Sequence, residues 1–195
     1  TNVPRTVACS PVRDLGLYEF VEGRKPTTRE VDTQMVNQVI AFFLDINGSR
    51  RNGYASQLPP ASEACFSVNE HVVMVDRRIA RLASIPAEEA VDRDALEFAQ
   101  ALADYWETAK DGILKEARRL DDLDAPVIER CISPSDFGFH NAILRPSGDI
   151  CFIDFEYAGW DDPAKMVGDF FSHPAVSVSN AHYERFLAET MRYSR

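Results

Sequence analysis

The strongest constraint on the fold is a short β-hairpin that carries polar side chains at its open end. Two apolar runs, Ala142–Leu144 and Ile150–Ile153, flank the sequence Pro-Ser-Gly-Asp, which is a signal for a tight turn. Asp136 and Asn141 come just before the first run, and Asp154 follows the second. Because a tight hairpin brings its two ends together, the sequence predicts that two carboxylates and one amide converge at one place.

This set of side chains suits a magnesium site. Mg²⁺ usually takes one or two carboxylates and fills the rest of its shell with water and phosphate oxygens. Phosphoryl transfer needs such a metal, together with a carboxylate that orients the attacking hydroxyl and accepts its proton. The competing interpretation is that these Asp and Asn residues only stabilise turns and strand ends, as they often do.

Strand-like and helical segments are segregated along the chain rather than alternating. Two strands come first, followed by a hinge or linker, three helices, a further strand, the hairpin and a last helix. The helices are predicted from apolar residues spaced three and four apart. In that order the expected segments are Arg5–Cys9, Gly16–Val21, Glu22–Pro26, Thr28–Asp45, Ser67–Pro86, Asp92–Leu120, Val127–Ile132, the hairpin and Asn180–Tyr193. This order indicates an α+β fold.

Local signals mark the ends of two of these helices. Thr27 or Thr28 is expected to cap the first helix, and Asn47-Gly48 is expected to end it in the left-handed conformation. Ser67 and Glu70 form a capping-box pattern at the start of the second helix.

The hairpin segment resembles the aminoglycoside phosphotransferase and choline kinase family, which has a protein-kinase-like fold. The resemblance is carried by Asp-x-x-x-x-Asn, the hairpin and the following Ile-Asp-Phe-Glu-Tyr. It implies that Asp136 is the catalytic base and that Asn141 and Asp154 are metal ligands. Glu156 completes the Asp-Phe-Glu of many of these enzymes, and no ligand role is carried over to it.

The resemblance extends to the first part of the chain. Gly-Leu-Tyr-Glu-Phe-Val-Glu-Gly, which begins at Gly16, is similar to the last strand and hinge of the small lobe. Backbone groups around Glu19 and Val21 would then bind adenine, with ATP and Mg²⁺ as the implied cofactors. Residues 1–23 are expected to be the end of a β-rich small lobe, and residues 24–195 a mainly helical large lobe with the catalytic hairpin.

A kinase fold also needs a glycine-rich loop, a strand Lys and a helix Glu. Nothing before Gly16 supplies them, and Met191–Arg195 stops inside a predicted helix. The chain is therefore expected to be a fragment that lacks most of the small lobe and is inactive on its own.

Two positions depart from the family pattern. Pro134 stands where the family usually has a His that supports the loop, so Ser133 or Ser135 is expected to supply substitute hydrogen bonds. Asp169 is displaced from the usual later acid and is interpreted as an anchor of the catalytic loop. His140 precedes Asn141 and is interpreted as a packed or hydrogen-bonded histidine.

Composition sets broad limits on partners and compartment. Lys plus Arg number 21 and Asp plus Glu number 31, so the formal charge is −10, which disfavours nucleic acid and anionic lipid as partners. No apolar run is long enough to span a membrane. The four cysteines have neither zinc-ligand spacing nor a disulfide framework, which favours the cytoplasm; they are Cys9, Cys65, Cys131 and Cys151.

The function indicated is ATP-dependent phosphorylation of a hydroxyl on a small molecule such as an aminoglycoside, sugar or amino alcohol. The alternatives are a non-catalytic nucleotide-binding or scaffold protein and a metal-dependent phosphate-ester hydrolase. A hydrolase would release free phosphate without phosphorylating an acceptor, which separates it from a kinase.

Overall fold

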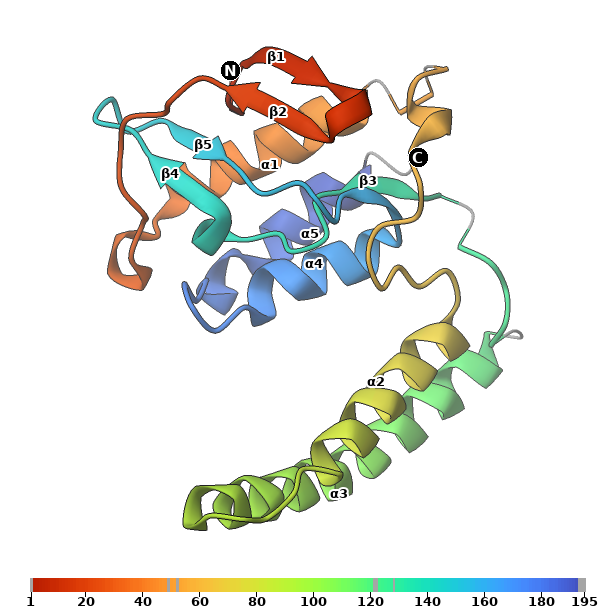
Figure 1. The fold of residues 1–195 in the computed structure, drawn as a ribbon. Helices are drawn as coiled ribbons and strands as arrows, with labels where there is room; N and C mark the ends of the chain where they lie inside the picture. The colour runs from red at the N-terminus through yellow and green to blue at the C-terminus, as the bar shows by residue number, and fades with distance from the viewer. Residues whose placement is uncertain (1, 49, 52, 121–122, 128, 193–195) are drawn as a thin grey trace. The chain divides into compact units, whose positions relative to one another are not determined.

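The computed structural model describes residues 2–48, 50–51, 53–120, 123–127 and 129–192 (Figure 1). The chain divides into two compact units. Unit 1 consists of residues 1–64 and 129–195, and unit 2 consists of residues 65–128. The lobe boundary that the sequence predicts at residue 23 lies inside unit 1, and the division into lobes stays a prediction.

Unit 1 contains three antiparallel strand pairs. The first pair is β1 (Thr6–Ser10) with β2 (Leu15–Tyr18), and the second is β4 (Ala142–Leu144) with β5 (Ile150–Phe152). The third pair joins β3 (Cys131–Ser133) to β6 (Gly159–Asp161). The predicted hairpin is confirmed, since Ile143 lies opposite Cys151 at the centre of the β4–β5 pair.

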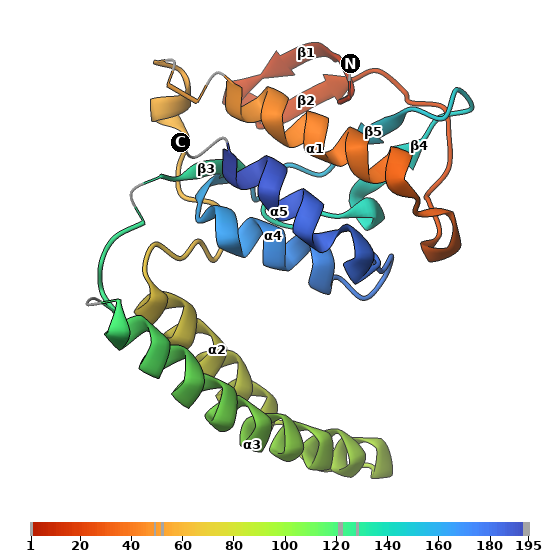
Figure 2. The same ribbon diagram turned by 180° about the vertical axis from the view of Figure 1, so that it is seen from behind.

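Three helices of unit 1 lie side by side and pack against the strands (Figure 2). They are α1 (Thr33–Gly48), α4 (Pro163–Ser172) and α5 (Tyr183–Arg192). Aromatic rings fill the space between the layers: the ring centroids of Phe42 and Phe152 are 4.4 Å apart, and those of Phe170 and Phe186 are 4.8 Å apart. Such rings bury a large apolar area, so this core fixes the helices against the β4–β5 hairpin.

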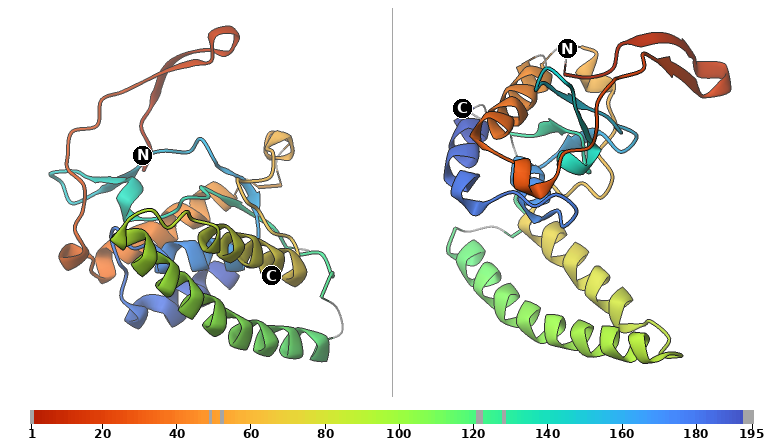
Figure 3. Two further views of the ribbon diagram at one scale, coloured as in Figure 1. Left: turned by 60° about the horizontal axis from the view of Figure 1, so that its bottom comes forward. Right: turned by 90° about the vertical axis from the view of Figure 1, so that its left-hand side faces the viewer.

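Unit 2 is a helical hairpin of α2 (Val68–Ala83) and α3 (Ala90–Arg119), which run antiparallel (Figure 3). Ser67 caps α2, because its hydroxyl accepts a hydrogen bond from the Glu70 N–H at 3.2 Å, as predicted. Across the hairpin, Trp106 Nε1 donates to Asp76 at 2.7 Å. No helix within the described ranges combines the length and the apolar character needed to cross a membrane.

Five 3₁₀ turns complete the described elements: Pro11–Arg13, Thr28–Glu30, Ala55–Gln57, Phe139–Asn141 and Asn180–His182. The second of them corrects the predicted start of the first helix. Thr27 forms a capping box with Glu30 on this 3₁₀ turn, whereas Asp32 accepts from the Met35 N–H at 2.8 Å near the start of α1. The two signals lie only five residues apart, so periodicity alone merges them into one helix.

Other boundaries also differ from the sequence-based expectation. β2 ends at Tyr18 and β3 begins at Cys131, so both strands are shorter than predicted, and β6 and α4 were missed. Gly112 does not interrupt α3. Two predicted segments reach Ile128 and Tyr193, which lie outside the described residues.

A close backbone approach holds the segment after β2 against β4. The Arg24 N–H donates to Leu144 O at 3.1 Å, and the Leu144 N–H donates back to Arg24 O at 2.8 Å. Gly23 has a φ of 154°, and a Cβ there would lie 2.5 Å from Leu144 O. Glycine is therefore required at this crossing, which brings residues 19–24 next to the hairpin.

Asn47 has a different role from the predicted left-handed helix end. Neither Asn47 nor Gly48 has a positive φ. The Asn47 side chain is fully buried, and its Nδ2 donates to Phe43 O and to Ile132 O, both at 3.0 Å. Its Oδ1 accepts from the Ile132 N–H at 2.7 Å, so Asn47 joins α1 to β3.

We expect Asn47→Ala to lower the free energy of unfolding by about 1–3 kcal/mol, because it leaves buried backbone groups of Ile132 without their partner. Urea denaturation followed by circular dichroism measures this change. Asn37→Ala is the matched control, since Asn37 is exposed on the same helix. An equal effect of the two substitutions would contradict the assigned role of Asn47.

Candidate functional site

The loop after β3 is held by serine hydroxyls. Ser133 is buried and its Oγ accepts from the Ser135 N–H at 3.0 Å. Ser135 Oγ donates to Ser62 O at 3.1 Å. The expectation that these serines support the loop beside Pro134 is confirmed. Ser135 has a φ of 72°, a left-handed conformation that these hydrogen bonds help to maintain.

Asp136 and Asn141 are in direct contact. Asn141 lies in the 3₁₀ turn before β4, and its Nδ2 donates to Asp136 O at 3.1 Å and to Asp136 Oδ2 at 3.2 Å. These bonds direct the amide nitrogen of Asn141 toward Asp136 and leave its Oδ1 as the atom able to accept or to ligate. The Asp136 side chain is 51% exposed, so its carboxylate is open to a second molecule.

Asp154 follows β5 and is tied to the same loop. The N–H of the preceding residue, Ile153, donates to Asn141 O at 3.0 Å. Asp154 has a φ of 68°, which is uncommon for a residue other than Gly. Residues held in such conformations cluster at functional sites. The structure therefore brings the hairpin ends together, as the sequence predicts, although the roles of Asp136, Asn141 and Asp154 stay predictions.

A cavity of about 750 Å³ joins the hairpin to the first part of the chain. Its lining includes Glu19 and Val21 on one side and Asp154 on the other, with Ile143 and Phe155 as apolar walls. Residues predicted from two distant motifs thus share one cavity. Its described lining does not include Asp136 or Asn141, which are connected to it through the Asn141–Ile153 hydrogen bond.

The open end of the β4–β5 hairpin, which we call the hairpin mouth, carries carboxylates that act together on Tyr157. A hydrogen bond to Glu156 and the charge of Glu156 raise the pKa of the Tyr157 phenol most, desolvation raises it further, and the charges of Asp154 and Asp136 add smaller contributions. The mouth is therefore a region of negative charge, which suits a dication and disfavours a free anion.

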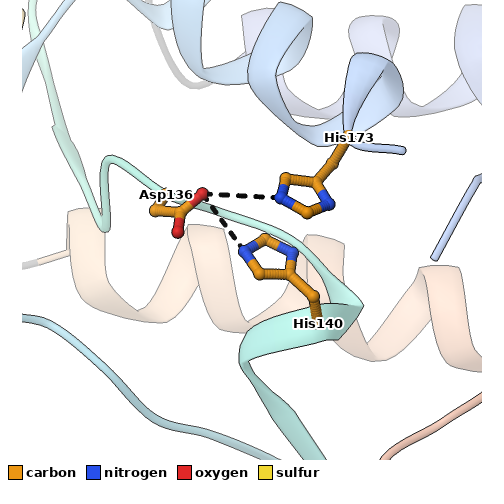
Figure 4. A group of neighbouring side chains, drawn as sticks. All are labelled: Asp136, His140 and His173. Carbon is orange, nitrogen blue, oxygen red and sulfur yellow. Dashed lines mark ion pairs between the residues drawn. The ribbon is translucent and has the colours of Figure 1, made fainter. Parts of the chain in front are cut away.

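Two histidines lie beside Asp136 (Figure 4). The Nε2 atoms of His140 and His173 lie 3.1 Å and 3.8 Å from Asp136 Oδ1, and the two rings stack with centroids 3.4 Å apart. The interpretation of His140 as a packed histidine is right for its ring, but neither of its ring nitrogens makes a hydrogen bond to a described residue. Sequence reasoning missed His173, which follows the unpredicted helix α4.

A buried ion-pair network lies next to this loop. Asp161 in β6 is fully buried, and Lys165 Nζ lies 3.3 Å from its Oδ2 and 2.6 Å from Asp169 Oδ2. Burial lowers the pKa of Lys165, but its interactions with the two aspartates outweigh burial and raise it. The predicted role of Asp169 as a loop anchor stays a prediction, and the structure places its carboxylate on Lys165.

No protein-family model matches the sequence, and no curated protein matches it. Solved structures do match its fold. Choline kinase LicA from Streptococcus pneumoniae aligns with a TM-score of 0.55 at 16% identity, over 97% of this chain and 56% of LicA. Choline kinase from Cryptosporidium parvum aligns with a TM-score of 0.56 at 14% identity, over 99% of this chain and 56% of its own.

A third solved structure is the ternary complex of streptomycin, ATP and APH(2'')-IIa, with a TM-score of 0.55 and 15% identity over 97% of this chain. This chain covers 60% of that protein, so it spans little more than half the length of the structures that it matches. With its strand pairs and helical layer, this chain has the α+β, protein-kinase-like fold of the choline kinases and of APH(2'')-IIa.

Proposed function

We propose that this chain carries the phosphoryl-transfer site of an ATP-dependent kinase that acts on a hydroxyl of a small molecule. The observation that supports this most is the single cavity that Glu19, Val21 and Asp154 share. A nucleotide lying in it would reach from the segment after β2 to the hairpin mouth. Similar solved structures include LicA with AMP and APH(2'')-IIa with ATP and streptomycin.

The adenine end of the nucleotide is assigned to the segment after β2. The Glu19 N–H is already donated to Arg5 O at 3.0 Å, so the Glu19 carbonyl is the group that remains for the adenine amino group. Val21 makes no backbone hydrogen bond to another described residue, which leaves its N–H as a donor to the ring. Ile143 and Phe155 supply apolar walls of the kind that nucleotide-sized pockets use.

Asn141 and Asp154 are the residues that would hold Mg²⁺. The fit rests on their donor atoms: Asn141 directs its nitrogen to Asp136 and keeps its oxygen available, and Asp154 adds a carboxylate at the cavity wall. Hard oxygen donors of this kind are what Mg²⁺ prefers. When bound, the metal supplies positive charge that neutralises the phosphates of the nucleotide.

Asp136 is the proposed general base. Its carboxylate is half exposed, and Asn141 Nδ2 fixes the position of its Oδ2. The carboxylate would orient the acceptor hydroxyl and take its proton as the oxygen attacks the terminal phosphate. The acceptor class is that of aminoglycosides, sugars and amino alcohols, and the cytoplasm is the proposed compartment.

Product analysis with the full-length protein tests this function. We expect incubation with ATP, Mg²⁺ and a panel of small alcohols to give a phosphorylated acceptor, detected by mass spectrometry, with ADP formed in equal amount. Release of free phosphate without any phosphorylated acceptor would instead show a hydrolase. Nucleotide binding without turnover of any acceptor would show a non-catalytic binding protein.

A further inference from the structure

The two ring nitrogens of His140 are buried and make no hydrogen bond within the described part of the chain, although Nε2 lies 3.1 Å from Asp136 Oδ1, at ion-pair distance. The His140 side chain is only 13% exposed. Most buried polar side-chain atoms in proteins do have a partner, and an atom without one calls for an explanation, of which a bound ion or water is one. His140 therefore points to a ligand at this position.

Potential ligand atoms gather around that position. One atom each from Asp136, His140 and His173 can be chosen so that all three lie within 4.8 Å of one another. Zinc binds nitrogen and oxygen at about 2.0–2.2 Å, so two ligand atoms of one ion lie about 3–4 Å apart. The distances from Asp136 Oδ1 to the two Nε2 atoms, 3.1 Å and 3.8 Å, fall in that range.

We propose that Asp136, His140 and His173 form a binding site for a transition-metal dication of the Zn²⁺ class. Two imidazoles and one carboxylate are a ligand set that zinc accepts with further positions open to water or substrate. Imidazole nitrogen favours Zn²⁺ over Mg²⁺, which prefers oxygen, so the site differs in selectivity from the one assigned to Asn141 and Asp154. The exposed side of Asp136 gives the ion a path from solvent.

Metal binding requires one change in the histidine pair. The rings are parallel within 5°, and an ion coordinates near the plane of an imidazole, so one ring must turn out of the stack. His173 is the more exposed of the two, at 24%, and follows the end of α4. Its Nδ1 accepts from the Ala175 N–H at 3.2 Å, and this single hydrogen bond is exchanged for coordination through Nε2.

Gly138 leaves room for the pair, since a Cβ at that position would lie 2.7 Å from His140 Nδ1.

Zinc binding at Asp136 would affect catalysis, a consequence that rests on the proposed function. A metal held by Asp136 occupies the carboxylate that is assigned to accept the hydroxyl proton, so the two uses of Asp136 exclude one another. Zn²⁺ would then inhibit phosphoryl transfer, and a chelator would restore it.

Direct binding tests the site without any assay of activity. We expect isothermal titration calorimetry of the full-length protein with Zn²⁺ to show a site whose affinity falls about tenfold or more in His173→Gln. His182→Gln is the matched control, because it removes another of the four histidines and lies outside the cluster, and its affinity should be unchanged. Mg²⁺ in excess should not displace the zinc.

Histidine ring NMR of the unaltered protein provides a second measurement that does not depend on a variant. We expect Zn²⁺ to shift the ring resonances of His140 and His173 and to leave those of His71 and His182 in place. The proposal would be overturned if the protein did not bind zinc, or if His173→Gln bound zinc as tightly as the wild type. It would also be overturned if His173→Gln and His182→Gln lost zinc affinity to the same extent. Because no nucleotide is present, these results are independent of whether the protein is a kinase.

Discussion

Replacing Asp136 by Asn is expected to lower kcat by about 10²–10⁴-fold, the usual contribution of a general base, while ATP affinity stays nearly unchanged. The expected pattern follows from position: Asp136 contacts Asn141 but does not belong to the described lining of the cavity assigned to the nucleotide. Loss of an interaction made mainly in the transition state lowers kcat and kcat/KM together, whereas loss of uniform binding raises KM alone.

Steady-state kinetics and nucleotide binding on the same folded sample of full-length protein measure this pattern. Asn keeps the size of Asp, and its side-chain oxygen can still accept the hydrogen bond from Asn141 Nδ2. Asp45→Asn is the control, since it makes the same change on the exposed surface of α1 and should leave kcat unaltered. An unchanged kcat in Asp136→Asn, or weakened ATP binding alone, would show that Asp136 is not the base.

The second large effect is expected at Asp154, where substitution by Asn should lower Mg²⁺-dependent kcat/KM by at least about 100-fold. Changes in groups that only support a metal ligand already cost about 10–100-fold, and a neutral amide is a weaker ligand for a hard cation than a carboxylate. Asn also tolerates the left-handed conformation better than most residues, so the φ of 68° at this position is retained. Ala at position 154 would add backbone strain, so the loss of the metal ligand could not be separated from the strain.

A magnesium titration of the full-length enzyme measures the effect of Asp154→Asn. Glu156→Gln is the matched control, because it removes a carboxylate from the lining of the same cavity and has no assigned ligand role. We expect the magnesium requirement of Glu156→Gln to stay close to that of the wild type. Normal turnover in Asp154→Asn, or a larger loss in Glu156→Gln, would show that Asp154 is not the ligand.

Much of the site was predictable because it lies within one short stretch of chain. The Asn141 side chain can reach Asp136 across a single loop, and β4 and β5 are three residues each, so Asp154 cannot lie far from Asn141. By contrast, nothing in the local pattern of Glu19 and Val21 points toward the hairpin. Their place near the hairpin was predicted only from the resemblance to the kinase family. In the structure, both residues line the same cavity as Asp154.

One missed element did have a signal in the sequence. Asp162 followed by Pro163 is a typical helix start, with an N-cap side chain before a proline at the first helical position. In the structure Asp162 Oδ1 accepts from the Ala164 N–H at 2.8 Å, and α4 begins at Pro163. Reading that signal would have placed His173 just after the end of a helix, although not beside Asp136.

Local signals in the sequence were enough to predict the hairpin, most of the helices and the convergence of Asp136, Asn141 and Asp154. These features depend on turn residues, caps and periodicity, which act over a few residues and leave a visible pattern. The hydrogen bonds between Asn47 and Ile132 and the stacking of His173 on His140 could be seen only in the folded chain. Those contacts join segments distant in the sequence, and they form because packing of the aromatic core brings α1, α4 and the hairpin together. No local preference of an Asn or a His encodes the partner that such packing places beside it.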